Sequence, residues 1–180
     1  MVRVPDRLPA VAGVFNRVRV LYQDETETLE QIRLHLERAN VLREDIRNDE
    51  ELVTETLEFC HLVASILETG SLVRLEEIQT QLEQNMETAV NPRNIRSYEG
   101  RLMEVRSIAS IMRSKPSPER LAEVKAENER SVVRVRQLME GNRQLMVTQE
   151  QRIEELELWI ERQERNVSRL EQIIANLAEE

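Results

Sequence analysis

Seven consecutive heptads, which run without a break from Val132 to Leu177, constrain this chain more than any other feature of its sequence. If Val132 is placed at heptad position a, every a position is apolar. Four of the seven d positions are apolar, and the other three carry side-chain amides. Such a repeat is typical of a long helix in a coiled coil. The a positions are Val132, Met139, Met146, Ile153, Ile160, Val167 and Ile174, and the d positions are Val135, Asn142, Gln149, Leu156, Gln163, Leu170 and Leu177.

The repeat lies in a predicted helix that runs from about Pro118 to Ala178. At 1.5 Å per residue this helix is about 90 Å long, which is too long to be buried in a globule made from the rest of the chain. We therefore expect much of it to pair with another chain or with a second copy. The a and d residues, together with Trp159 at a g position, are predicted as a partner interface.

The positions beside this stripe indicate which partner is favoured. The g positions include Leu138, Leu145, Trp159 and Ile173, which widens the apolar stripe and favours a bundle of three or four helices over part of the length. By contrast, β-branched a residues with leucine at d favour a two-stranded parallel coil. Trp159 is then either part of a bundle core or a residue that dominates partner binding.

Charge at the e positions favours a hetero-oligomer over a homodimer. The e residues Glu150, Glu157, Glu164 and Glu171 are all acidic. In a parallel homodimer only Arg152 among the facing g residues would offer them a positive charge, so an arginine-bearing partner fits better than a second copy. The three d amides are expected to pair across the interface and fix its register at some cost in stability.

Helix-start and helix-stop residues divide the remaining chain into four further helices. Asn48 with Glu51 resembles a capped start, Gly70 is a stop, Ser71 is a cap, and Pro92 follows Asn91 at a break. The predicted helices are Leu8–Ile46, Asp49–Thr69, Leu72–Val90 and Arg93–Arg113. The sequence thus predicts an all-α protein: an elongated helical bundle or set of hairpins over 8–113, a Pro/Ser linker over 114–118, and a coiled-coil helix over 119–178.

Composition excludes several classes of protein. With 4 Gly, 5 Pro and 3% aromatic residues, the chain lacks the turn and strand residues of sheet proteins and nucleotide-binding α/β folds. A net charge of −9 argues against general nucleic-acid binding. A single cysteine allows no intrachain disulfide and favours a reducing compartment. No apolar run approaches a transmembrane length and no signal peptide is recognisable, so we expect a cytoplasmic protein, with the nucleus as the alternative compartment.

Residues with catalytic or metal-binding potential are few. Glu58 and His61 match the Glu-x-x-His motif of di-iron helical bundles, but that site needs two such motifs, and Ile32 occupies the equivalent place before His35. Cys60 is expected to be a small buried hydrophobe. We therefore predict no catalytic residue, no metal site and no cofactor, and a protein that is not an enzyme.

The linker contains one candidate regulatory residue. Ser117 precedes Pro118, and Arg120 completes the pattern used by proline-directed kinases. A phosphate on Ser117 would sit at a helix N-terminus, where negative charge is stabilised. The alternative is an ordinary serine N-cap followed by proline at the first helical position.

In size and layout the chain is similar to small helical subunits of microtubule-linked assemblies: the smallest shoulder subunit of dynactin, kinetochore rod subunits, augmin subunits and intraflagellar-transport subunits. This likeness implies a structural subunit of a hetero-oligomeric coiled-coil assembly, most consistent with a cytoskeletal scaffold. The alternative is a subunit of a membrane-trafficking tether or adaptor. In that case the segment Arg3–Arg19 would form a basic amphipathic helix on an anionic membrane surface. Its apolar residues would otherwise begin the stripe of the first helix.

Overall fold

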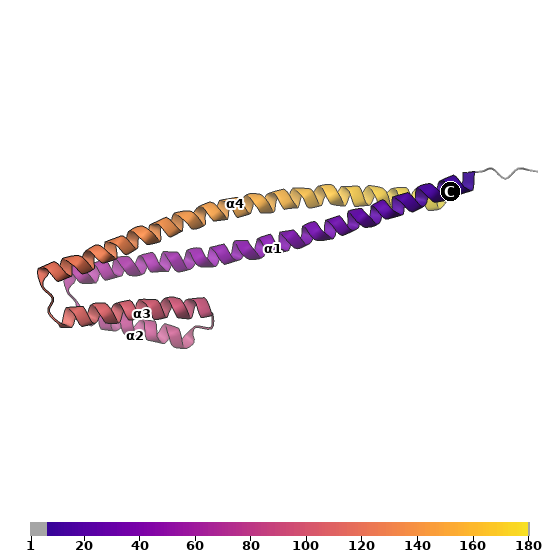
Figure 1. Cartoon of the computed structure of the whole chain (residues 1–180). Coiled ribbons are helices and arrows are strands. Elements are labelled where there is room, and N and C mark those ends of the chain that lie inside the picture. The colour runs from indigo at the N-terminus through magenta and orange to yellow at the C-terminus, as the bar shows by residue number, and fades with distance from the viewer. Residues whose placement is uncertain (1–6, 180) are drawn as a thin grey trace, which may run out of the picture. The chain divides into compact units, whose positions relative to one another are not determined.

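The computed structural model describes residues 7–179, with side chains from residue 12 onward, and every element in this range is a helix. The four helices are α1 (Arg7–Thr69), α2 (Leu72–Thr88), α3 (Pro92–Arg113) and α4 (Pro118–Glu179) (Figure 1). The predicted all-α class is confirmed, with one long C-terminal helix and helical hairpins before it.

Local residues explain where the helices begin and end. Gly70 adopts a φ of +66° directly after α1, a left-handed conformation that glycine reaches at little cost. The Ser71 side chain then caps α2 by accepting a hydrogen bond from the Arg74 N–H at 3.4 Å. The Asn91 side chain caps α3 by accepting from the Arg93 N–H at 2.9 Å, with Pro92 as the first helical residue.

The predicted break at Asn48 is wrong, because α1 continues through it to Thr69. Asn48 is exposed within this helix. No glycine or proline lies near it, and asparagine inside a helix costs only about 0.7 kcal/mol relative to alanine. A capping pattern alone therefore did not end the helix. The consequence is a second long helix in the same chain.

The residues group into two compact units. Unit 1 comprises Met1–Asp45 and Met146–Glu180, and unit 2 comprises Ile46–Leu145. The predicted domains follow one another along the chain, whereas each unit combines a part of α1 with a part of α4.

Unit 2 contains the larger core. It is formed by the end of α1, by α2 and α3, which pack side by side, and by the start of α4 (Figure 1). Burying a Val, Leu or Ile side chain fully contributes roughly 1.5–3 kcal/mol, so this core is the main source of stability in unit 2. Its buried residues are Phe59, Val63, Ile66, Leu67, Leu75, Leu82, Leu102, Val105, Ile108, Ala109 and Val124.

Unit 1 is built from two antiparallel helical segments, the first part of α1 and the last part of α4. Its core cluster consists of Ala39, Ile153 and Leu156, with Ile32 and Leu36 packed against them. A pair of helices buries one stripe from each partner and leaves the rest of both helices open to solvent. Unit 1 is therefore mostly surface.

Candidate interaction surface

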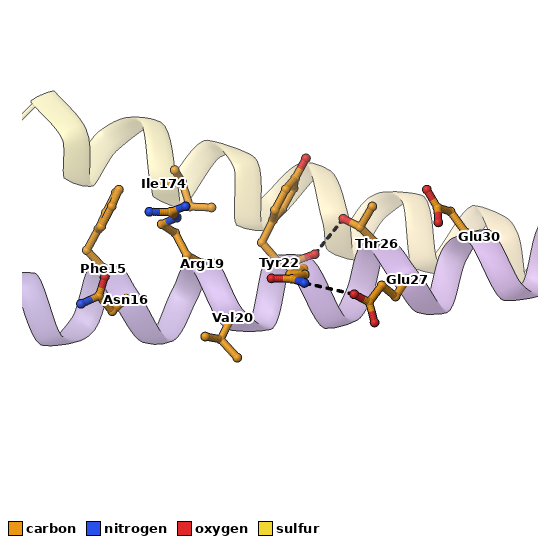
Figure 2. A pocket seen from close by; sticks show the side chains of 10 residues that line it. Phe15, Asn16, Arg19, Val20, Tyr22, Thr26, Glu27, Glu30 and Ile174 are labelled. Atoms are coloured by element: carbon orange, nitrogen blue, oxygen red, sulfur yellow. Dashed lines mark hydrogen bonds between the residues drawn. The ribbon is translucent and has the colours of Figure 1, made fainter.

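The two helices of unit 1 meet along a heptad seam, which we define as the a and d residues of α4 together with the α1 residues that face them. In α4, every a and d residue from Met146 to Leu177 is buried or half-buried. The facing α1 residues recur at alternating spacings of three and four, and Figure 2 shows Phe15 and Tyr22 on the side of α1 that faces α4, with Val20 on the opposite side. These α1 residues are Phe15, Val18, Tyr22, Glu25, Leu29, Ile32, Leu36 and Ala39.

Two of the predicted d amides bond to the α1 backbone and not to other amides. The Gln149 side chain donates to the Ala39 carbonyl oxygen at 2.8 Å. The Gln163 side chain donates to the Glu25 carbonyl oxygen at 3.0 Å and also to the Glu25 carboxylate. The two glutamines lie two heptads apart in α4, and their acceptors lie two heptads apart in α1, so both bonds define a single antiparallel register.

The e positions of the two helices face each other on one side of the seam. Arg33 of α1 forms an ion pair with Glu164 of α4 at 2.8 Å, and both are e residues. The Tyr22 hydroxyl donates to Glu171, another e residue, at 2.8 Å, and this hydrogen bond raises the pKa of Tyr22. The arginine-bearing helix that the e glutamates were predicted to meet is thus present within the chain, as α1.

The neighbouring b positions make this side strongly acidic. We call it the acidic flank, defined as the e and b positions of α1 and α4 in unit 1. Its e glutamates are joined by Glu30 and Glu37 of α1 and by Glu154 and Glu161 of α4. A surface groove opens along it, lined by seam residues such as Phe15 and by polar residues such as Arg19 (Figure 2). Over residues 15–40 of α1 and 146–177 of α4, its e and b residues apart from Val147 and Ala175 are polar or charged.

The g positions lie on the other side of the seam, because an antiparallel pair that brings e beside e also brings g beside g. Large apolar side chains gather there and remain exposed: Trp159 is 47% exposed and Leu21 is 51% exposed. Sequence reasoning predicted Trp159 as an interface residue, and the structure places it beside the seam and open to solvent. We call this surface the apolar flank, defined as Val14, Leu21, Leu42, Trp159 and Ile173.

The predicted interface residues that belong to unit 2 follow the same heptad pattern. Val135 is 8% exposed, and Val132, Met139 and Asn142 are half-buried. The g residues Leu138 and Leu145 are exposed, as on the apolar flank. Each unit therefore uses the a and d positions of α4 for packing within the chain.

Sequence reasoning missed Asn128, a d residue one heptad before Val135. It is 5% exposed, and its side chain donates to the Cys60 carbonyl oxygen at 3.0 Å. The Asn128 Oδ1 atom has no hydrogen-bond partner within residues 7–179. Lys125 occupies the a position of this heptad, so the heptad does not fit the pattern of apolar a residues. Only the amide at d could have indicated that the packed face of α4 extends to Asn128.

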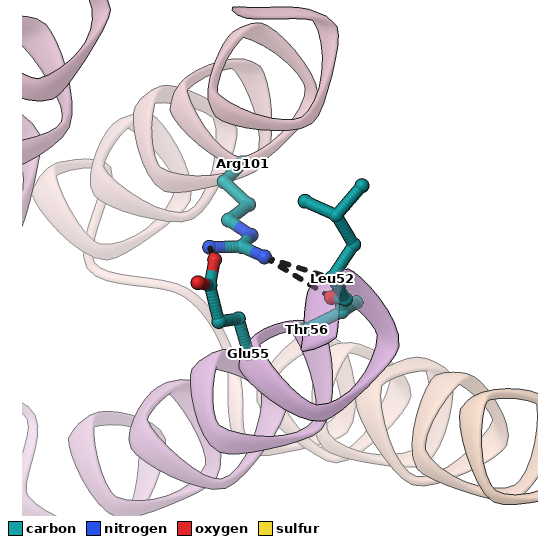
Figure 3. A network of polar contacts seen from close by, with 4 residues as sticks. All are labelled: Leu52, Glu55, Thr56 and Arg101. Carbon is teal, nitrogen blue, oxygen red and sulfur yellow. Dashed lines mark hydrogen bonds and ion pairs between the residues drawn. The ribbon is translucent and has the colours of Figure 1, made fainter. Parts of the chain in front are cut away.

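Unit 2 also contains a nearly buried guanidinium. The Arg101 side chain is 10% exposed and reaches from α3 to α1, where it pairs with Glu55 at 3.4 Å. It also donates to the Leu52 carbonyl at 3.4 Å and to the Thr56 hydroxyl at 3.2 Å (Figure 3). This contact ties α3 to α1 through one side chain.

Other arginines of α3 pair with acids of the same unit at the surface. Arg93 pairs with Asp49 of α1 at 2.7 Å, and Arg113 pairs with Glu76 of α2 at 3.0 Å. The basic residues of α3 thus meet the acidic helices of their own chain. A carboxyl that lacks such a partner behaves differently: burial, and secondarily the charge of Glu127, raise the pKa of Glu104.

The residues with catalytic potential do not converge. Glu58 and His61 are exposed, and no group of three or more His, Cys, Asp or Glu side chains in the described range is placed to hold a metal ion. Cys60 is 3% exposed, in keeping with its predicted role as a buried hydrophobe, and burial raises the pKa of its thiol.

Ser117 acts as the N-cap of α4. Its hydroxyl accepts a hydrogen bond from the Arg120 N–H at 3.1 Å, and Pro118 is the first helical residue. This geometry agrees with the simpler of the two interpretations of the Ser117 motif. Ser117 is also exposed, so its hydroxyl is within reach of a modifying enzyme.

The basic N-terminal segment lies partly outside the described side chains, since Arg3, Arg7 and Val11 fall there. Within the described part, Arg17, Arg19 and Val14 are exposed, while Phe15 and Val18 belong to the seam. No helix between residues 7 and 179 has the length and apolar character needed to cross a bilayer.

Comparison of the chain with protein-family models, with curated proteins and with solved structures gives no match.

Proposed function

We propose that this protein is a non-enzymatic structural subunit of a hetero-oligomeric coiled-coil assembly in the cytoplasm, of the kind that builds cytoskeletal scaffolds. One observation carries the proposal: the seam is made within the chain, yet the apolar flank beside it stays exposed. A row of exposed large apolar residues along a helix pair is typical of a surface that contacts another protein.

The chemistry of the rest of the chain supports a contact role. Within residues 7–179 many of the charged side chains form ion pairs with one another, and no group of three or more His, Cys, Asp or Glu side chains is placed to hold a metal ion. Contact area between helices is what such a chain offers a partner.

The experiment is purification of the tagged chain from its own cells under mild conditions, followed by light scattering of the eluted material. We expect a complex of fixed stoichiometry that is much heavier than one copy and contains other helical proteins. A chain that elutes from fresh extract as a monomer would contradict the proposal.

A second function, as a subunit of a membrane-trafficking tether, is favoured by the exposed Val14, Arg17 and Arg19 near the N-terminus. These residues would extend the basic amphipathic segment that begins at Arg3. Flotation of the full chain with phosphatidylserine-rich vesicles tests this function. The matched variant replaces Arg17 and Arg19 by glutamine, and flotation that is absent, or equal for both proteins, would argue against it.

A further inference from the structure

The charged residues that border the apolar flank differ from those of the acidic flank. The c positions lie next to the g positions on the outer surface of each helix. In unit 1 these bordering residues include Arg17 and Arg38 on α1 and Arg162 and Arg169 on α4, while the negative charges there are Asp24, Asp45 and Glu155. Along one side of unit 1, exposed apolar residues are thus bordered by four arginines and three acids.

The bordering cations are available for contact. Arg17, Arg38, Arg162 and Arg169 are exposed, and none of them forms an ion pair within residues 7–179. Arg152, a g residue, stacks over the Trp159 ring at 5.6 Å from the ring centroid and pairs with Glu155 at 3.6 Å. Arginine is the cation best suited to pair with carboxylates across a helix interface.

From this we propose that the apolar flank is the docking site for an acidic amphipathic helix of another protein, whose apolar stripe covers Leu21 and Trp159 and whose carboxylates pair with the bordering arginines. The proposal rests on the proposed function and specifies the chemistry of the partner. A third helix on this side would complete a three-helix bundle in unit 1.

Charge and pattern favour this occupant over a second copy of the chain. Two apolar flanks placed face to face would bring their arginine borders together, and like charges across an interface are unfavourable. The acidic flank of a second copy carries the right charge, but its e and b positions lack the large apolar side chains that would cover Trp159. A partner helix has to supply both features.

The same observations favour a helix over a lipid surface. The apolar residues occupy g positions on both helices at separations of one, two or three heptads, with Thr28, His35 and Asn166 at the g positions between them. This period matches the side-chain period of a third helix. The carboxylates of the acidic flank, and the net charge of −9 of the whole chain, would be repelled by an anionic membrane.

Trp159 provides the measurement, because it is the only tryptophan of the chain and lies on the apolar flank. The full chain is titrated with a synthetic four-heptad peptide that has leucine at a and d, glutamate at e and g, and no aromatic residue. We expect a blue shift of the tryptophan emission, protection from acrylamide quenching, and weaker binding as salt is added. The control peptide has lysine at e and g and should cause no blue shift and no protection from quenching.

Paired variants test the two parts of the proposed site. Arg162→Glu and Arg169→Glu should each lower the affinity about threefold or more. The control Arg165→Glu makes the same change of charge at an f position on the outside of α4 and should leave the affinity unchanged. Leu21→Ser should abolish binding, whereas Val20→Ser, on the opposite side of α1, should not (Figure 2). Circular dichroism of each variant verifies that the helices are intact.

Four outcomes would overturn the proposal. They are the absence of binding, equal binding of the glutamate and lysine peptides, a homodimer that Leu21→Ser dissociates, and an emission shift with phosphatidylserine-rich vesicles but not with the peptide. If the chain purifies from cells in a complex that Arg162→Glu and Leu21→Ser leave intact, only the docking site is refuted. If it purifies as a monomer, the proposed function itself fails.

Discussion

At the scale of single residues, burial separates the polar contacts that matter for stability from those that do not. Arg101 and Arg106 are both on α3 and both pair with a glutamate of unit 2. The Arg101 side chain is 10% exposed, whereas the Arg106 side chain is 57% exposed. Exposed ion pairs contribute little, while hydrogen bonds made by a charged group that is largely removed from water contribute roughly 1.5–3 kcal/mol.

We predict that Arg101→Ala lowers the free energy of unfolding by roughly 2 kcal/mol, because it removes the hydrogen bonds to Leu52 and Thr56 and the pairing with Glu55 (Figure 3). The control Arg106→Ala should cost less than about 0.5 kcal/mol. Urea denaturation followed by circular dichroism measures both. Equal losses for the two variants would show that the Arg101 network adds nothing specific.

Glu104 gives a prediction on pH. Its pKa in the folded chain is raised above the ordinary value of 4.5, first by burial and then by the charge of Glu127. Stability linked to this carboxyl is therefore fully present below pH 4.5 and is lost as the pH rises through the raised folded pKa. The ionised form of Glu104 is therefore a cost to folding.

We expect Glu104→Gln, which keeps the shape without the charge, to be more stable than the original chain at neutral pH, because a neutral amide loses less on burial than a carboxylate. The gain should shrink as the pH falls toward the ordinary glutamate pKa. Thermal denaturation at a series of pH values tests this, with Glu99→Gln at an exposed position of α3 as control. A gain that is independent of pH would exclude the electrostatic cause.

At the scale of helices, the seam amides determine register more than stability. The Ala39 and Glu25 carbonyls lie inside α1 and are also within reach of its own helical N–H groups, so the bonds from Gln149 and Gln163 are additional. Losing an additional bond at a satisfied carbonyl costs little. An apolar residue in place of either glutamine would extend the apolar packing of the seam.

We predict that the double variant Gln149→Leu and Gln163→Leu unfolds at the same or a higher urea concentration but loses its single register. Light scattering should then detect mixed oligomers, because an all-leucine seam accepts several alignments. Gln151→Leu, at an exposed f position, is the control and should keep the oligomeric state of the original chain. Lower stability with unchanged oligomeric state would be the contrary result.

The start of α4 provides a second prediction at this scale. Ser117→Ala removes the hydroxyl that accepts the Arg120 N–H and should cost about 1 kcal/mol. Ser117→Asp retains an acceptor and adds a negative charge at the helix N-terminus, so we expect it to be at least as stable as serine. Thermal denaturation compares the two variants. If Ser117→Ala loses no stability, the cap contributes nothing. If Ser117→Asp loses as much stability as Ser117→Ala, a phosphate there would not act through the helix terminus.

At the scale of the whole molecule, the two units differ in how much apolar surface they bury. Unit 2 contains an extended core drawn from four helices, while the core cluster of unit 1 is three buried residues on two helices. Two-helix pairs with a single seam have little packing with which to offset the entropy of ordering a chain. The chain also carries one natural reporter in each unit, Trp159 in unit 1 and Cys60 in unit 2.

We expect the Trp159 fluorescence transition to occur at a lower urea concentration than the exposure of Cys60 to a thiol reagent. In the absence of urea Cys60 should react slowly, because it is buried and its thiol pKa is raised by burial. Coincident transitions would show instead that the two units unfold as one. Cys60→Ala serves as the blank for the labelling reaction.

Sequence reasoning predicted the heptad register of α4 correctly, since the a and d residues are the ones that the structure buries or half-buries. Periodicity determines which face of a helix is covered. Periodicity does not determine which segment covers that face. The missing covering helix was α1, and it was divided in two because the cap-like pattern at Asn48 was given more weight than the uninterrupted helix formers around it.

Much of the candidate site could not be predicted for the same reason. The glutamates at e and the apolar residues at g, including Trp159, were recognised from the sequence. Assigning them to opposite sides of a helix pair requires knowing whether the two helices run parallel or antiparallel. That orientation follows from contacts such as Arg33 with Glu164, which join residues far apart in sequence. Asn128 was missed because a lysine interrupts the apolar pattern in its heptad.

The bonds from Gln149 and Gln163 to backbone carbonyls have a consequence for how this sequence can diverge. Every residue has a carbonyl oxygen, so α1 can exchange the side chains at Ala39 and Glu25, within the space available, and still accept these bonds. The two glutamines of α4 have no such freedom. We therefore expect related sequences to retain amides at these two α4 positions while the facing α1 positions vary, which would allow the pairing to be recognised in a relative from α4 alone.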